Sequence, residues 1–124
     1  MSVEEKFLRI LKETQEPAFD VETNGLDWKR YYVCGYSISD GREAVYVPVR
    51  HEMGGNIPRV QEFEKELDKT ISQHTGKIVA HNAKFDMHFA QNHGINLGNK
   101  VIDTMTMACL LDENRRSFSL GTVS

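Results

Sequence analysis

Residues 18–26, Ala-Phe-Asp-Val-Glu-Thr-Asn-Gly-Leu, place two carboxylates, Asp20 and Glu22, two positions apart at the end of a short apolar run. Such a run is typical of a β-strand, and side chains in a strand alternate between its faces, so both acids point the same way. Two carboxylates on one face of a buried strand repel each other and lose hydration, which a fold tolerates mainly when a cation lies between them. The spacing predicts a metal site; the alternative is a pair of solvated turn residues.

A third acid, Asp86, lies in residues 81–89, His-Asn-Ala-Lys-Phe-Asp-Met-His-Phe. It follows a second apolar strand at the opening of a helix, where it could complete the metal site. A lone Asp near a helix start usually caps the helix or interacts with its dipole, and this is the alternative for Asp86. Asp103 is expected to be such a cap, for a helix that begins directly after it.

The length and net charge of the chain limit its number of domains and the partners that it can bind. A chain of 124 residues can bury one sheet-and-helix core, so one domain is expected. The net charge of −3 argues against a simple DNA-binding module, and any nucleic-acid contact must be local or bridged by metal. The two cysteines lack metal-ligand spacing, and no apolar stretch approaches the ~20 residues of a membrane span. A cytoplasmic protein without membrane contact is expected.

The order of the expected elements favours an α/β fold. Asp40-Gly41 is a hairpin signal between two segments rich in aromatic and β-branched residues, and Pro58 suits the first turn of an amphipathic helix that Gly76 ends. The expected elements are helix 2–13, strands 18–23, 31–38 and 44–49, helix 58–75, strand 78–80, helix 85–94, strand 101–102 and a helix from 103 to 112. Three meandering strands followed by alternating helices and strands predict a mixed sheet flanked by helices.

In such a sheet the strands at 18–23 and 78–80 can lie side by side, so that Asp20, Glu22 and Asp86 meet at one edge. Three hard oxygen ligands without a matching histidine or cysteine favour Mg2+ or Mn2+ over Zn2+ and predict metal-assisted phosphoryl transfer. With two ions about 4 Å apart, Asp20 suits the bridging position, Glu22 suits the ion that activates water, and Asp86 supports the second ion.

The stretches Phe19–Leu26 and Asn82–Asp86 resemble the first and second exonuclease motifs of the 3′-5′ proofreading domains of family A (polymerase I-like) DNA polymerases. Residues 44–51 and 101–112 resemble the same domains in order and spacing, so the resemblance covers nearly the whole chain. It implies a ribonuclease H-like fold whose mixed sheet has three antiparallel strands and then parallel strands. It also implies catalytic, metal-binding carboxylates at Asp20, Glu22 and Asp86, and a single-stranded DNA 3′ end as substrate.

The resemblance also assigns substrate contacts. Leu26 matches the apolar residue that packs on the terminal base, and Thr23 matches a position beside the terminal nucleotide. Asn82 matches the polar residue near the scissile nucleotides, and Phe85 stands where the family often has tyrosine.

One family feature is missing from the 124 residues. The family has a third motif, Tyr or His a few residues before a fourth Asp, several tens of residues beyond the second. Tyr36 to Asp40 has the tyrosine spacing but leads into a hairpin turn, and His81 to Asp86 has the histidine spacing but uses an Asp already assigned. Residues 1–124 are therefore expected to be an incomplete exonuclease domain, a fragment or one half of a split polymerase that a downstream polymerase polypeptide completes, with reduced activity alone.

The sequence leaves two other functions open: an RNA-trimming exonuclease of the same superfamily, and a catalytically silent nucleic-acid-binding or assembly module. Of the other residues, Trp28, His81, His88, His93 and the methionines at 105 and 107 are expected to have surface or packing roles. Five basic residues are expected to be mostly solvated surface: Lys29, Arg30, Arg42, Arg50 and Lys84.

Overall fold

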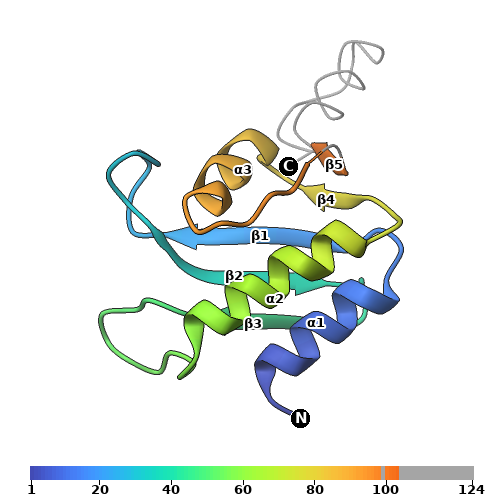
Figure 1. Ribbon diagram of the computed structural model, residues 1–124, viewed down its shortest axis with the longest axis horizontal. Coiled ribbons are helices and arrows are strands. Elements are labelled where there is room, and N and C mark those ends of the chain that lie inside the picture. Colours follow the sequence, from blue (N-terminus) through green and yellow to red (C-terminus); the bar gives the residue numbers. More distant parts are fainter. Residues whose placement is uncertain (99, 104–124) are drawn as a thin grey trace, which may run out of the picture.

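The computed structural model describes residues 1–98 and 100–103, which form a five-stranded sheet with three helices (Figure 1). The elements are α1 (Val3–Glu13), β1 (Ala18–Thr23), β2 (Val33–Ser39), β3 (Ala44–Pro48), α2 (Val60–Gln73), β4 (Ile78–Ala80), α3 (Ala83–Gln91) and β5 (Val101–Asp103). The strand order is β3-β2-β1-β4-β5, with β1, β2 and β3 antiparallel and β4 and β5 parallel to β1 and to each other. The predicted mixed sheet is confirmed.

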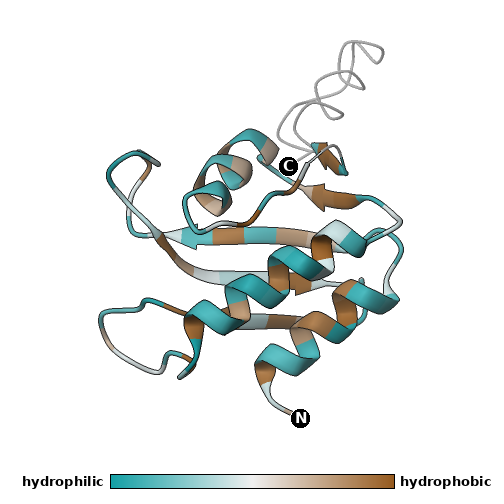
Figure 2. Ribbon diagram, in the orientation of Figure 1, coloured by the Kyte–Doolittle hydropathy of each residue, from teal (hydrophilic) through white to brown (hydrophobic). Residues whose placement is uncertain are grey.

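The two faces of the sheet differ in polarity. On one face the strands contribute apolar side chains to the core, and α1 and α2 lie side by side across it (Figures 1 and 2). The rings of Phe7, Phe19, Tyr36 and Phe63 pack there with centroid separations of 5.5 to 6.3 Å. The alternate residues of β1 and β2 point to the opposite face, which is more polar. The third helix, α3, contacts β1, β4 and β5 instead.

Two helix boundaries differ from the prediction for local reasons. Ser2 caps α1, accepting a hydrogen bond from the N–H of Glu5 in a capping box, so the helix begins one residue later than expected. The helix α2 begins at Val60, with Arg59 as its N-cap, so Pro58 precedes the helix and does not lie in its first turn. The predicted helix from 103 to 112 lies outside the described residues.

Among residues 1–98 and 100–103, no helix is long and apolar enough to cross a membrane.

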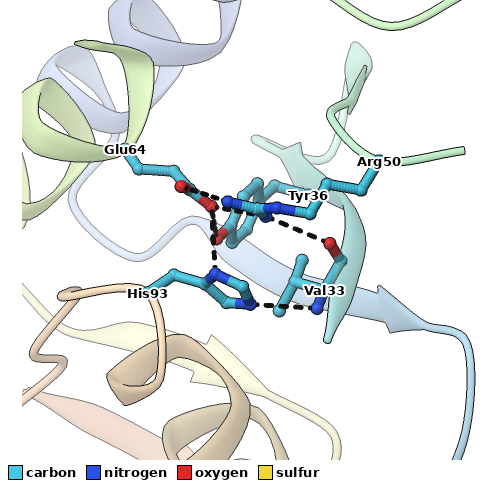
Figure 3. Close-up of polar contacts among 5 residues, drawn as sticks. All are labelled: Val33, Tyr36, Arg50, Glu64 and His93. Atoms are coloured by element: carbon cyan, nitrogen blue, oxygen red, sulfur yellow. Dashed lines mark hydrogen bonds and ion pairs between the residues drawn. The ribbon is translucent and has the colours of Figure 1, made fainter. Parts of the chain in front are cut away.

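A buried polar cluster ties the sheet to α2 and to the turn after α3. Glu64 of α2 is only 5% exposed, and its carboxylate accepts two hydrogen bonds from Arg50, at 2.6 and 2.9 Å, and one from the Tyr36 hydroxyl at 2.6 Å (Figure 3). Arg50 also donates to the carbonyl of Val33, while Nε2 of His93 accepts from the Val33 N–H at 3.1 Å. The prediction that Arg50 is solvated is wrong, because its charge neutralises Glu64 in the interior.

His93 gives this cluster a pH dependence. Burial, and then the positive charge of Arg50, lowers the pKa of His93 below its ordinary value of 6.5. The unfolded chain takes up a proton as the pH falls through 6.5, whereas the folded chain resists it, so the free energy of unfolding decreases below that pH.

We expect His93→Gln to remove part of the stability loss that occurs between about pH 7 and pH 5. Urea unfolding at each pH measures this. The unmutated chain, unfolded at the same pH values, is the reference. An equal slope in both proteins would contradict the expectation.

Candidate active site

The two acids of the first motif lie on the polar face of the sheet. Asp20 and Glu22 alternate with the buried Phe19 and Val21, so both carboxylates are exposed on the same side of β1. Across the antiparallel pair, Asp20 lies opposite Ser37 and Glu22 opposite Gly35, so neither acid has a cationic neighbour in the adjoining strand. The predicted common direction of the two side chains is therefore present.

Asp86 has the most unusual environment of the three acids. It lies in the first turn of α3 and is 1% exposed, and neither carboxylate oxygen has a hydrogen-bond partner among the described residues. Burial, followed by the charge of Asp20, raises the pKa of Asp86 to about 8. An orphaned carboxylate beside a second carboxylate is costly in a folded protein, and a bound cation would relieve both the desolvation and the repulsion.

Asp103 contributes to the same region in an unexpected way. It is the last residue of β5, and its Oδ2 accepts a hydrogen bond from the backbone N–H of Ala83 at 3.3 Å. It thus interacts with the N-terminus of α3, which explains why this helix begins at Ala83, two residues earlier than predicted. Asp103 is predicted to cap a helix that follows it, and that helix lies outside the described residues. The helix start that Asp103 contacts is instead that of α3.

The structure brings together two of the three predicted metal ligands. The charge of Asp20 acts on Asp86, whereas the carboxylate of Glu22 accepts a hydrogen bond from Tyr46 at 3.3 Å. In the part of the chain that the structure describes, no three His, Cys, Asp or Glu side chains are gathered into a group that could hold a metal ion. The orphaned oxygens of Asp86 next to Asp20 are the feature that fits a divalent cation, and the ligand set itself stays a prediction.

The four residues expected to contact substrate lie within a few positions of these acids in the sequence, but their side chains differ in exposure. Leu26, in the loop after β1, is 85% exposed, and Asn82, which precedes α3, is also exposed. The Thr23 hydroxyl donates to the carbonyl of Gly25. Phe85 is half-buried, with its ring 4.7 Å from that of Phe89 and packed against the core. Leu26 and Asn82 are thus accessible to a ligand, whereas part of the Phe85 ring is buried against Phe89 and the core.

Open space lies next to Asp20. A cavity of about 300 Å³ occupies the polar face of the sheet, and its lining includes Ala18, Asp20, Ser37, Ser39, Val79 and His81. The wall consists of small, hydroxylic and apolar side chains, with one imidazole. Asp20 therefore faces Asp86 in one direction and an accessible hollow in another.

The sequence matches the 3′-5′ exonuclease family over residues 2–123. The chain belongs to this family. It is a 3′-5′ exonuclease domain of the DNA polymerase I type, and the family's activity is that of a nuclease hydrolase. The resemblance carried by the two motifs is confirmed.

Curated relatives agree with this assignment. The chain is 30% identical over 110 residues to DNA polymerase I of Borreliella burgdorferi, an alignment that covers 88% of the chain and 12% of the polymerase. It is 32% identical over 114 residues to the DNA polymerase of Escherichia phage T5, with 86% of the chain and 12% of the polymerase covered. The chain thus corresponds to about one eighth of the length of these relatives.

Solved structures support the fold. The EXO domain of Aedes aegypti Nibbler superposes with a TM-score of 0.66 at 13% identity, covering 93% of this chain and 54% of that one. Brucella melitensis NrnC with bound Mg2+ superposes with a TM-score of 0.56 at 22% identity, covering 83% and 47%. The exonuclease domain therefore has the ribonuclease H-like sheet that the resemblance implied.

Sequence reasoning missed Tyr46, whose hydroxyl contacts Glu22, and His51, whose ring contacts the same hydroxyl. A signal was present: Val45 and Val47 are apolar, so Tyr46 must point to the opposite face of β3, the face that carries Glu22 on β1. The packing role predicted for Trp28 and His88 agrees with their rings, which stack on each other at 4.7 Å.

Proposed function

We propose that residues 1–124 form a two-metal-ion 3′-5′ exonuclease domain that hydrolyses single-stranded DNA from its 3′ end, as the proofreading part of a polymerase I-like enzyme. The observation that carries this proposal is the buried carboxylate of Asp86 beside Asp20, which has no hydrogen-bond partner among the described residues, in a chain that matches the exonuclease family over residues 2–123. Mg2+ or Mn2+ is the expected cofactor, because the acids are hard oxygen donors.

Each acid has a distinct role in this proposal. Asp20 acts on Asp86 and shares one face of β1 with Glu22, so it would contact both ions, Glu22 would hold the ion on the nucleophile side, and Asp86 would hold the second ion. Bound divalent cations would supply an activated water and neutralise the charge that develops on the leaving oxygen. Because Glu22 and Asp86 serve different ions, they have no need to touch each other.

The proposed substrate contacts involve side chains that lie near the acids in the sequence, and two of them, Leu26 and Asn82, are exposed. Leu26, exposed in the loop after β1, would stack on the terminal base of a frayed strand, with Thr23 beside the same nucleotide. Asn82 and Phe85, at the start of α3, would border the scissile nucleotides. Since the chain's net charge is −3, the bound cations rather than a basic surface would attract the phosphate backbone.

Calorimetric titration with Mn2+ tests the first step. The unmutated chain should bind Mn2+, and Asp20→Asn should lose most of this binding because it removes the carboxylate shared by both ions. Glu62→Gln, which removes an exposed carboxylate from α2, should leave Mn2+ affinity unchanged. Absence of Mn2+ binding by the unmutated chain would refute the proposed site.

Substrate cleavage tests the second step. The chain is incubated with Mn2+ and 5′-labelled single-stranded DNA, with RNA of the same sequence in a parallel reaction. The reactions are then repeated in the presence of a downstream polypeptide carrying a Tyr-x-x-x-Asp motif. Stepwise shortening of DNA from its 3′ end supports the proposal, faster shortening of RNA favours the RNA-trimming alternative, and no cleavage in any reaction favours a silent binding module.

A further inference from the structure

Two side chains outside the predicted site form a chain of hydrogen bonds that ends on Glu22. The Tyr46 hydroxyl donates to Oε2 of Glu22 at 3.3 Å, and the same hydroxyl lies 2.5 Å from Nε2 of His51. A tyrosine hydroxyl has a single proton, so when it donates to Glu22 it must accept from Nε2–H of His51. With the His51 proton on Nε2, the order of donation is His51 to Tyr46 to Glu22.

A glycine makes this contact possible. Tyr46 lies on β3 and Glu22 on β1, with β2 between them. Gly35 of β2 pairs directly with Glu22, and a Cβ atom at Gly35 would lie 1.9 Å from the Tyr46 hydroxyl oxygen. The phenol ring therefore lies across β2 in space that any other residue at position 35 would fill.

The far end of the hydrogen-bond chain is also fixed. The side-chain amide of Asn56 accepts from the backbone N–H of His51 at 2.7 Å and donates to the carbonyl of the same residue at 2.9 Å. The His51 ring stands edge-on to Tyr46, with an angle of 78° between the ring planes. Asn56 thus holds His51, and His51 holds the hydroxyl of Tyr46.

We propose that Tyr46, oriented by His51, is a positioning residue that holds Glu22 ready to bind a divalent cation. The inference rests on the proposed function, in which Glu22 is a metal ligand. Glu22 is exposed, and a free glutamate side chain must lose rotational freedom when it binds a cation. A hydrogen bond to Oε2 restricts the side chain in advance and leaves Oε1 for the cation, as outer partners of metal ligands commonly do.

The test is Mn2+ affinity, measured by calorimetry on the full chain. Tyr46→Phe keeps the ring and removes only the hydroxyl, and it should weaken Mn2+ binding by about tenfold, the lower end of the range for such partners. Gly35→Ala should weaken binding similarly, because the new methyl group displaces the hydroxyl from Glu22. Tyr32→Phe removes a hydroxyl from the loop before β2 and should leave the affinity unchanged.

A double-mutant cycle separates positioning from general loss of structure. If Tyr46 acts through Glu22, Tyr46→Phe should have no further effect on Mn2+ affinity in a Glu22→Gln background. Equal affinity of Tyr46→Phe and the unmutated chain, or an equal loss in both backgrounds, would overturn this inference alone. An unmutated chain that binds no Mn2+ would overturn the proposed function and this inference together.

Discussion

Asp86→Asn should make the metal-free chain more stable at pH 8 and abolish the stabilisation of the chain by Mn2+. Its carboxylate is buried, has no hydrogen-bond partner among the described residues and lies beside Asp20. An amide of nearly the same size carries no charge and can donate to the Asp20 carboxylate, so it removes both the desolvation penalty and the repulsion. A metal-binding side chain that destabilises the metal-free fold is expected to be retained for cation binding rather than for stability.

The pH dependence of this effect has a definite sign. The unfolded chain releases the Asp86 proton near its ordinary pKa of 3.8, whereas burial and the charge of Asp20 raise the pKa of the folded chain to about 8. Between these values the folded chain binds more protons, so the free energy of unfolding decreases as the pH rises. We expect Asp86→Asn to recover on the order of 2 to 4 kcal/mol at pH 8 and little at pH 4.

Thermal unfolding of both proteins at several pH values, with EDTA or with Mn2+, measures the prediction. Asp40→Asn is the matched control. Hydrogen bonds from the backbone N–H groups of Glu43 and Arg42 lower the pKa of Asp40, so its charge favours the fold instead of opposing it. Asp40→Asn should bring no gain at pH 8 and keep the Mn2+ response. A less stable Asp86→Asn protein at pH 8 in EDTA would show that Asp86 has a structural role.

The fold could be predicted because its signals are local. Alternating apolar residues in 18–23, the Asp40-Gly41 turn and the helical spacing of Phe63, Leu67 and Ile71 each specify one element, and the order of elements limits the sheet to few arrangements. Boundaries are less predictable, because they depend on distant partners. Asp103 extends α3 back to Ala83 from a strand 20 residues away, a contact that no local pattern encodes.

The acids of the site could be predicted as residues but not as an arrangement. Spacing places Asp20 and Glu22 on one face, yet only the tertiary fold shows that Asp86 is buried against Asp20 while Glu22 turns toward Tyr46. The same reason explains the error at Arg50. A basic residue in a loop is usually solvated, and the partner that buries it, Glu64, lies in a helix that the sequence pattern shows only as amphipathic.

Arg50→Met should destabilise the fold strongly, because it leaves a buried charge without its counterion. Arg50 neutralises Glu64, which is 5% exposed, through two hydrogen bonds, at 2.6 and 2.9 Å. Its removal would leave a buried carboxylate with the Tyr36 hydroxyl and the imidazole of His93 as its nearest partners, and breaking such a pair typically costs about 3 to 5 kcal/mol. Urea unfolding at pH 7 measures the change in the free energy of unfolding.

Two further variants show whether the cost arises from the unpaired charge. Arg50→Met combined with Glu64→Gln removes both charges and should be less destabilised than the sum of the single substitutions predicts. Arg9→Met breaks another arginine–glutamate pair, in which Nη2 of Arg9 donates to both carboxylate oxygens of Glu43 at 2.9 and 3.0 Å, but both side chains are substantially exposed. Water can solvate the charge that remains, so Arg9→Met should have a much smaller effect. Similar losses for Arg50→Met and Arg9→Met would mean that Glu64 tolerates a free charge, and the cluster would then contribute packing rather than charge neutralisation.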